Sequence, residues 1–175
     1  MRKLILIKHA SPLVIPGTPT EQWKLSDKGK ESCVPLADAL SAYEPSVIVS
    51  SDEPKALETA QLVASSLAIP TAIAPNLHEH DRSNVPHMRN GEFISHMELF
   101  FRRPGELVLG KETADEALER MESAIGELLT KHPAGNVAVV SHGTVIALFV
   151  ASGIVLGSTN RIPEHIVGHG DRLET

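Results

Sequence analysis

The chain of 175 residues has very little cysteine and few aromatic residues. Cys33 is the only cysteine, which excludes an intrachain disulfide and a zinc site built from several thiolates. Trp23 and Tyr43 are each the single residue of their type, and such isolated rings offer no stacking platform for nucleic acid. Because a lone cysteine fits a reducing compartment, we expect a cytoplasmic protein.

The sequence also lacks an excess of positive charge and a long hydrophobic run. A formal net charge of −6 argues against a broad basic surface, so any affinity for phosphate must be local. The apolar run that follows the amino-terminal basic residues ends at Lys8 and His9, which is too short for a signal peptide. We therefore expect neither a nucleic-acid partner nor a membrane association.

What the chain does contain is an alternation of apolar runs and helical patterns. This alternation predicts an α/β fold, in which strands buried among helices form a parallel sheet. The length fits one domain, and we assign residues 1–175 to it. We predict strands over residues 3–8, 46–50, 71–74 and 137–141.

Capping signals mark the starts of the predicted helices. Ser26 caps the first helix, which we expect Pro35 to interrupt, and Pro54 opens the second. Thr113 and Glu116 form a capping box for a long helix, and Gly143 opens the last one. We interpret residues 75–111 as an excursion over the active face, with a short helix at 96–101. The tail after residue 153 shows only a weak strand signal at 165–167.

Two histidines occupy matching positions directly after predicted strands. His9 follows the first strand and His142 follows the fourth. In parallel sheets ligands bind outside the carboxyl ends of the strands, so both imidazoles should face one crevice. Lys8 and Lys55 project toward the same edge, with Lys55 in the first turn of a helix, and these four groups predict a compact anion site.

These residues lie in motifs that resemble the histidine phosphatase superfamily, which has the phosphoglycerate mutase-like fold. The resemblance spans roughly residues 1–152 and consists of five segments in the family's order. The family's Arg-His-Gly motif resembles Lys8-His9-Ala10, and its Leu-Thr-x-x-Gly motif resembles the segment Leu25–Gly29. Its Ser-Ser-x-x-x-Arg-Ala-x-x-Thr-Ala motif resembles the segment Ser50–Ala60. Its Leu-x-Glu and Ser-His-Gly motifs resemble Leu77-His78-Glu79 and Ser141-His142-Gly143, respectively. The resemblance implies a three-layer α/β/α sandwich with a mostly parallel central sheet.

The resemblance also implies a mechanism for phosphoryl transfer that needs no metal or cofactor. His9 would attack phosphorus and form a phosphohistidine, and Glu79 would protonate the leaving oxygen and then activate water. Lys8, Lys55 and a protonated His142 would neutralise the phosphoryl oxygens. Ser11 and Gly143, which lie beside the two histidines in the sequence, complete the expected substrate-binding set. Asp81 and Glu92 are fallback acids.

The chain departs from the family pattern around the expected nucleophile. Lysine stands at both positions where the family uses arginine, and lysine binds phosphate as a point charge without the planar fork of arginine. Ala10 adds a methyl group where the family has glycine. We expect weaker or less precise catalysis, but the retained charges at Lys8 and Lys55 favour a preserved anion site.

The excursion contains four histidines, at positions 78, 80, 87 and 96. They have neither thiol neighbours nor a helical i, i+4 histidine pair, so their pattern does not favour a metal site. We expect them to contact substrate or to lie exposed on the surface.

The leading prediction is a metal-independent phosphatase acting on a phosphorylated small molecule or a phosphoprotein. A phosphoglycerate-type mutase is less favoured, because such mutases generally carry a longer lid. A phosphohistidine phosphatase would have less need of an acid such as Glu79. Outside enzymes, the two lysines leave open a phosphate or phosphopeptide binding module. The oligomeric state stays open.

Overall fold

The computed structural model describes residues 2–86 and 88–153 of the chain, in which helices and strands alternate. The weak strand signal at 165–167 and His87 lie outside the described residues. In chain order the elements are β1 (Leu4–Lys8), the short 3-10 helix η1 (Thr20–Gln22), α1 (Asp27–Ser41), β2 (Pro45–Ser50), α2 (Pro54–Leu67), β3 (Thr71–Ile73), α3 (Asn90–Arg102), α4 (Ala114–Lys131), β4 (Asn136–Ser141) and α5 (Gly143–Ala151).

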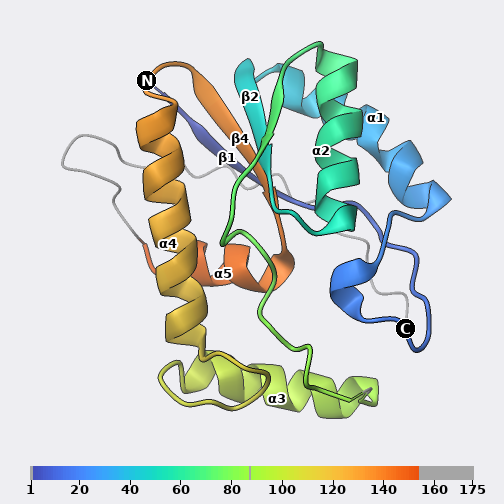
Figure 1. Ribbon diagram of the computed structural model, residues 1–175, viewed down its shortest axis with the longest axis vertical. Coiled ribbons are helices and arrows are strands. Elements are labelled where there is room, and N and C mark those ends of the chain that lie inside the picture. Colours follow the sequence, from blue (N-terminus) through green and yellow to red (C-terminus); the bar gives the residue numbers. More distant parts are fainter. Residues whose placement is uncertain (1, 87, 154–175) are drawn as a thin grey trace.

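The four strands form one parallel sheet in the order β1-β4-β2-β3. Helices α1 and α2 lie on one side of this sheet, and α4 and α5 lie on the other (Figure 1). The predicted α/β class and three-layer α/β/α arrangement are therefore confirmed. Strand β4 pairs with both β1 and β2, so the ends of these three strands are neighbours.

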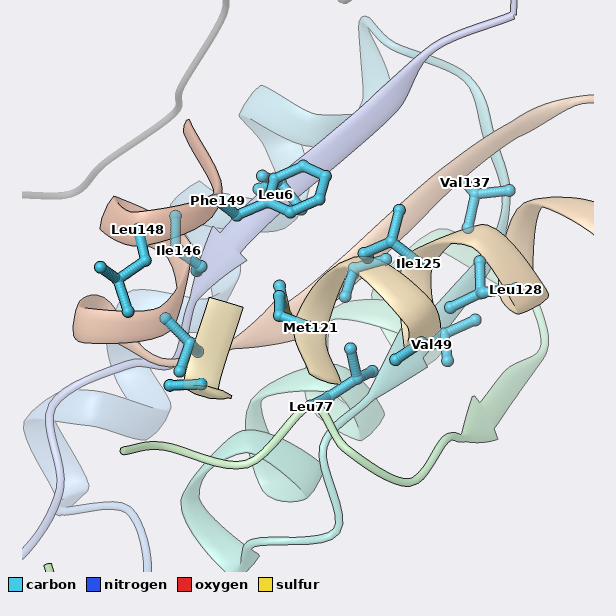
Figure 2. Packing of buried hydrophobic residues seen from close by; sticks show 14 of the residues in the cluster. Leu6, Val49, Leu77, Met121, Ile125, Leu128, Val137, Ile146, Leu148 and Phe149 are labelled. Carbon is cyan, nitrogen blue, oxygen red and sulfur yellow. The ribbon is translucent and has the colours of Figure 1, made fainter. Parts of the chain in front are cut away.

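Both faces of the sheet are buried, because alternate residues of each strand enter different hydrophobic clusters. Leu6 and Val139 pack with α4 and α5, and Figure 2 shows Leu6 in one cluster with Met121 and Ile125 of α4 and Phe149 of α5. Ile7 and Val140 point to the opposite face and pack with α1 and α2. Side chains on both faces thus fix the sheet from which the site projects.

Local capping explains where the helices begin. The Ser26 side chain accepts a hydrogen bond from the Gly29 amide, Pro54 occupies the first turn of α2, and Thr113 and Glu116 form the predicted capping box. The expected interruption at Pro35 is wrong, since α1 continues through it to Ser41. Pro35 lies on the exposed side of α1, where water can satisfy the freed backbone carbonyl.

A close backbone contact explains why a glycine, Gly29, lies in the first turn of α1. A Cβ at Gly29 would overlap the backbone oxygen of Ser11, so only glycine permits this approach. The Ser11 oxygen also accepts hydrogen bonds from the Ser26 amide and hydroxyl, each at 3.0 Å. The start of α1 is therefore fastened to the loop that follows His9.

The excursion contains more helix than the sequence predicted. Helix α3 spans 13 residues instead of the short piece expected at 96–101, and its Phe100 is fully buried. The apolar residues of α3 show only weak helical periodicity, because Phe100 is the only buried residue of this helix. The sequence therefore did not indicate its full length. Within the described chain, no helix is both long and apolar enough to cross a bilayer.

Candidate active site

His9 lies immediately beyond β1 with one ring nitrogen fixed by the backbone. Its Nδ1 is 2.8 Å from the Ala10 carbonyl oxygen, which can only accept, so Nδ1 carries the proton. The lone pair is therefore on Nε2. Burial, together with the positive charges of Lys55 and Lys8, lowers the pKa of His9 to about 4. The imidazole is consequently neutral at pH 7.

His142 occupies the N-cap position of α5 and is completely buried. Its ring centroid is 5.1 Å from that of His9, so the structure brings the two predicted histidines together. Burial, followed by the effects of His9 and Lys55, lowers the pKa of His142 to about 2. The expectation that His142 is protonated is wrong, because burial disfavours the charged ring and the neighbouring positive charges act in the same direction.

The hydrogen bonds of His142 leave one of its ring nitrogens for a ligand. Nε2 lies 3.0 Å from the Ser51 hydroxyl, which follows β2. Nδ1 is buried and lacks a hydrogen-bond partner among the described residues. A buried polar atom without a partner costs free energy, and an acceptor oxygen of a ligand would satisfy a protonated Nδ1.

Lys55 stands in the first turn of α2, as the sequence predicted, but its charge is already paired. The side chain is buried, and its Nζ donates to the Thr20 carbonyl oxygen at 2.8 Å and to the Glu53 carboxylate at 2.5 Å. The sequence analysis missed Glu53. A glutamate just before a helix ordinarily lies in solvent, where its charge interacts with the helix dipole. Only tertiary packing shows that the Glu53 side chain turns inward.

Glu53 connects several groups of the site. Its Oε1 accepts a hydrogen bond from the Glu79 amide at 2.8 Å and lies 3.5 Å from His142 Nε2. Its Oε2 holds Lys55. The structure therefore places a carboxylate between two of the groups that were predicted to hold a phosphoryl group.

Lys8 is exposed at the end of β1, beside the start of α5. A Cβ built at Gly143 would lie 3.7 Å from Lys8 Cε and 3.8 Å from Cδ, so the lysine stem passes close to Gly143. Both lysines lower the pKa of His9, which places their charges near the imidazole. Unlike Lys55, Lys8 keeps its side chain accessible to solvent.

Glu79 is positioned by backbone amides and lies near Arg82, which follows it in the same segment. Its Oε1 accepts from the His80 amide at 2.9 Å, and its Oε2 accepts from the Thr144 amide at 3.2 Å. Arg82 Nη2 lies 3.9 Å from the same carboxylate. The negative charge of Glu79 also acts on the His9 pKa. The predicted acid thus lies near the predicted nucleophile.

Arg120, a residue that the sequence analysis did not single out, holds the segment that carries Glu79. It donates to the carbonyl oxygens of Asn76, His78 and Glu79 at 2.9–3.1 Å. It also makes a two-pronged ion pair with Glu112, at 2.8 and 2.6 Å. No sequence pattern marks such a role, because its partners are mainly backbone atoms.

Thr59 of α2 fixes the turn after His9. Its hydroxyl accepts from the Ala10 amide at 3.0 Å and donates to the Lys55 carbonyl oxygen at 2.7 Å. The Ala10 methyl group packs against the cluster beneath α1 and α2, so the fold accommodates this departure from glycine. Ser11, through its backbone oxygen, anchors α1, and its expected contact with substrate stays a prediction.

The remaining polar residues of the excursion lie in different surroundings. Hydrogen bonds from Ser83 lower the pKa of Asp81, which therefore suits proton donation poorly, and Glu92 is exposed in the first turn of α3. His80 is buried against Phe100, with ring centroids 4.3 Å apart, so the expectation of surface exposure is wrong for it. His78 and His96 are partly buried.

An open pocket of about 390 Å³ adjoins Glu53 and Glu79. Three separate segments line it, at residues 20–21, 52–54 and 78–83. Among residues 2–86 and 88–153, no group of three or more histidine, cysteine, aspartate or glutamate side chains is arranged to hold a metal ion. The pocket is large enough for a small organic molecule.

Comparison with known proteins agrees with this arrangement. The profile of the histidine phosphatase superfamily (branch 1) matches residues 17–163. Glucosyl-3-phosphoglycerate phosphatase of Mycolicibacterium vanbaalenii is 27% identical over 172 residues, covering 87% of this chain and 74% of the relative. The probable phosphoglycerate mutase GpmB of Cronobacter sakazakii is 25% identical over 134 residues, covering 73% of this chain and 62% of the relative.

The fold is shared with solved structures. A mycobacterial glucosyl-3-phosphoglycerate phosphatase in complex with VO3 superposes with a TM-score of 0.73 at 21% identity, over 87% of this chain and 80% of that one. The family match covers most of the chain and includes His142, Lys55 and Glu79. The chain therefore belongs to the histidine phosphatase superfamily.

Proposed function

We propose that the protein is a metal-independent phosphatase that hydrolyses a phosphomonoester, of a small molecule or a phosphoprotein, through a phosphohistidine on His9. The observation that carries this proposal is the state of His9. Its Nδ1 proton is held by the Ala10 carbonyl, and its pKa of about 4 keeps Nε2 unprotonated at pH 7. A neutral, oriented imidazole is the form that attacks phosphorus.

The reaction runs in two balanced steps. In the first, the His9 Nε2 lone pair forms a bond to phosphorus while the bond to the leaving oxygen breaks, and Glu79 gives that oxygen a proton. In the second, water attacks the phosphohistidine, Glu79 takes a proton from the water, and inorganic phosphate leaves as the bond to Nε2 breaks. Glu79 is thereby returned to its starting protonation state.

The other residues of the site stabilise the transferring group. Lys8 and Lys55 supply positive charge near His9, and the unpartnered His142 Nδ1 supplies a hydrogen bond from a neutral ring. Ser11 and Gly143 complete the substrate-binding set in this proposal. The pocket beside Glu79 receives the alcohol part of the substrate. Its lining includes five carboxylates, at Glu21, Asp52, Glu53, Glu79 and Asp81, but only one arginine, so we infer a neutral or cationic alcohol.

A phosphate or phosphopeptide binding module is the second candidate. The ion pair between Lys55 and Glu53 favours it, because a neutralised cation contributes less to the transition state. The two candidates share the anion site and differ in whether His9 becomes phosphorylated.

Hydrolysis of a generic aryl phosphate in excess chelator separates the candidates. We expect phosphate release by the native protein and a loss of at least about 10³-fold in His9→Ala, since nucleophile removal abolishes the covalent route. His132→Ala, at the carboxyl end of α4, is the matched control and should retain full activity. Phosphate binding without turnover would favour the binding module, and unchanged turnover in His9→Ala would exclude this mechanism.

A further inference from the structure

We propose that the Glu53 carboxylate is an internal anion that competes with the phosphoryl group for Lys55, and so sets how tightly the site holds phosphate. This inference rests on the proposed function, because it concerns the same anion site. It adds a determinant of affinity at a residue that the mechanism does not use.

One oxygen of the Glu53 carboxylate pairs with Lys55, and the other lies beside residues that carry the reacting groups. Oε2 accepts from Lys55 Nζ, and Oε1 lies 3.5 Å from His142 Nε2. Oε1 also accepts from the Glu79 amide at 2.8 Å. The carboxylate side chain is only 9% exposed, and Lys55 is the cation that compensates it there. The Glu53 carboxylate therefore already occupies the cation that a phosphoryl oxygen would use.

Lys55 cannot pair fully with the Glu53 carboxylate and with a phosphoryl group at the same time. Two like charges within one partly desolvated site repel each other much more than they would in water. A phosphoryl group that approaches His9 must therefore share Lys55 with Glu53 or displace the carboxylate. Glu53 also lines the adjoining pocket, so its side chain has open space beside it into which it can turn.

The competition would weaken binding of the phosphoryl group in product and in substrate alike, so the alcohol part decides which of the two binds more tightly. A phosphomonoester adds contacts through its alcohol part in the adjoining pocket, whereas free phosphate depends on the anion site alone. Glu53 would thus favour release of the product. If Glu53 instead only holds Lys55 in place, removal of the Glu53 charge should leave phosphate binding unchanged or weaken it.

Calorimetric titration with inorganic phosphate distinguishes these roles. Glu53→Gln removes the charge and keeps the shape, and its amide oxygen can still accept from the Glu79 amide. We expect phosphate to bind on the order of tenfold more tightly to Glu53→Gln than to the native protein. Glu53→Met, which is uncharged and of similar size, should also tighten binding.

Glu31→Gln on α1 is the matched control, since it makes the same change of side chain and charge outside the site. Glu31 is exposed, so solvent screens it, and we expect phosphate affinity to change less than about twofold. Melting curves of all variants establish that they are folded at the temperature of the titration.

The outcomes separate this inference from the proposed function. Unchanged or weaker phosphate binding in Glu53→Gln overturns the competition and assigns Glu53 to the positioning of Lys55. Tightening by the same factor in Glu31→Gln also overturns it, because the effect would then be one of general charge. Absence of phosphate binding in the native protein and all variants, together with absence of turnover, contradicts the proposed function itself.

Discussion

The two histidines show that burial can give one residue type two different roles. His9 is partly buried, and a backbone carbonyl fixes its tautomer, which leaves Nε2 free. His142 is completely buried, and Ser51 occupies its Nε2. Only His9 therefore presents a lone pair toward solvent-accessible space, whereas His142 is suited to hydrogen bonding.

The protonation of His9 can be measured directly by NMR titration of histidine-labelled protein. We expect its imidazole to titrate near pH 4, because burial and two lysines disfavour the charged form. The ring is neutral above that pH and gains a proton below it, so the nucleophile should stay active through the range in which an ordinary histidine, with a pKa of about 6.5, becomes charged. His9→Gln identifies the signal.

Lys8→Met should raise the pKa of His9, because it removes one of the charges that lower it. Lys131→Met, at the end of α4, is the control and should leave the titration unchanged. A His9 signal that titrates near 6.5 in the native protein would contradict the burial argument on which the nucleophile assignment depends.

At the scale of elements, the site is formed by strand ends and held by helices on both faces. Thr59 on α2 fixes the turn after His9, and Arg120 on α4 fixes the segment that carries Glu79. The nucleophile and the acid are therefore positioned from opposite sides of the sheet. Movement of either helix would change the distance between them.

Replacement of Arg120 tests the role of α4. Arg120→Lys loses the fork that reaches Glu112 and three carbonyl oxygens, and we expect it to lower the free energy of unfolding by about 2–4 kcal/mol. Turnover should also fall under conditions where the variant is folded, since Glu79 loses its support. Urea denaturation and kcat measure the two effects.

Arg103→Lys is the control for this change. Its ion pair with Glu106 is exposed, at 58% and 64%, and should contribute less than about 0.5 kcal/mol. Full activity in a destabilised Arg120→Lys would show that Arg120 stabilises the fold without positioning Glu79.

Regular elements were predictable from the sequence because their signals are local. The strand before His142, the capping box at Thr113 and the start of α2 at Pro54 each depend on a few adjacent residues. Helix α3 was underestimated, since only Phe100 is buried along it. Pro35 was misjudged because a proline on the exposed side of a helix can be tolerated.

The site was predictable only as far as its motifs reach. The placement of His9, His142 and Glu79 follows from the order of strands and from the family resemblance. The inward turn of Glu53 and the carbonyl contacts of Arg120 arise from tertiary packing, which has no period in the sequence. The neutral state of His142 likewise depends on a degree of burial that the strand pattern does not specify.

At the scale of the whole molecule, the pocket joins segments that are far apart in the sequence. Residues 20–21 follow β1, residues 52–54 link β2 to α2, and residues 78–83 begin the excursion. Each segment contributes carboxylates, in a chain with a net charge of −6. The positive charge beside His9 thus comes from Lys8 and Lys55, and Arg82 is the one arginine of the pocket lining.

This distribution predicts the charge of the preferred alcohol. We expect kcat/KM to be highest for phosphomonoesters of a cationic or neutral alcohol, such as phosphocholine or a simple sugar phosphate. The value of kcat/KM for 3-phosphoglycerate should be lower by about tenfold or more, because its carboxylate would meet the acidic lining. The comparison uses one buffer at low and at high salt, and the difference should shrink at high salt because ions screen the pocket.

The charge of the lining can be changed without altering the reacting groups. Glu21→Gln should reduce the difference in kcat/KM between 3-phosphoglycerate and the other substrates, because Glu21 lines the pocket on the side of η1. Glu31→Gln, an exposed change on α1, serves as the control for net charge. A preference for 3-phosphoglycerate in the native protein would contradict the electrostatic argument, and would instead indicate that Arg82 is the side chain of this lining that selects the substrate.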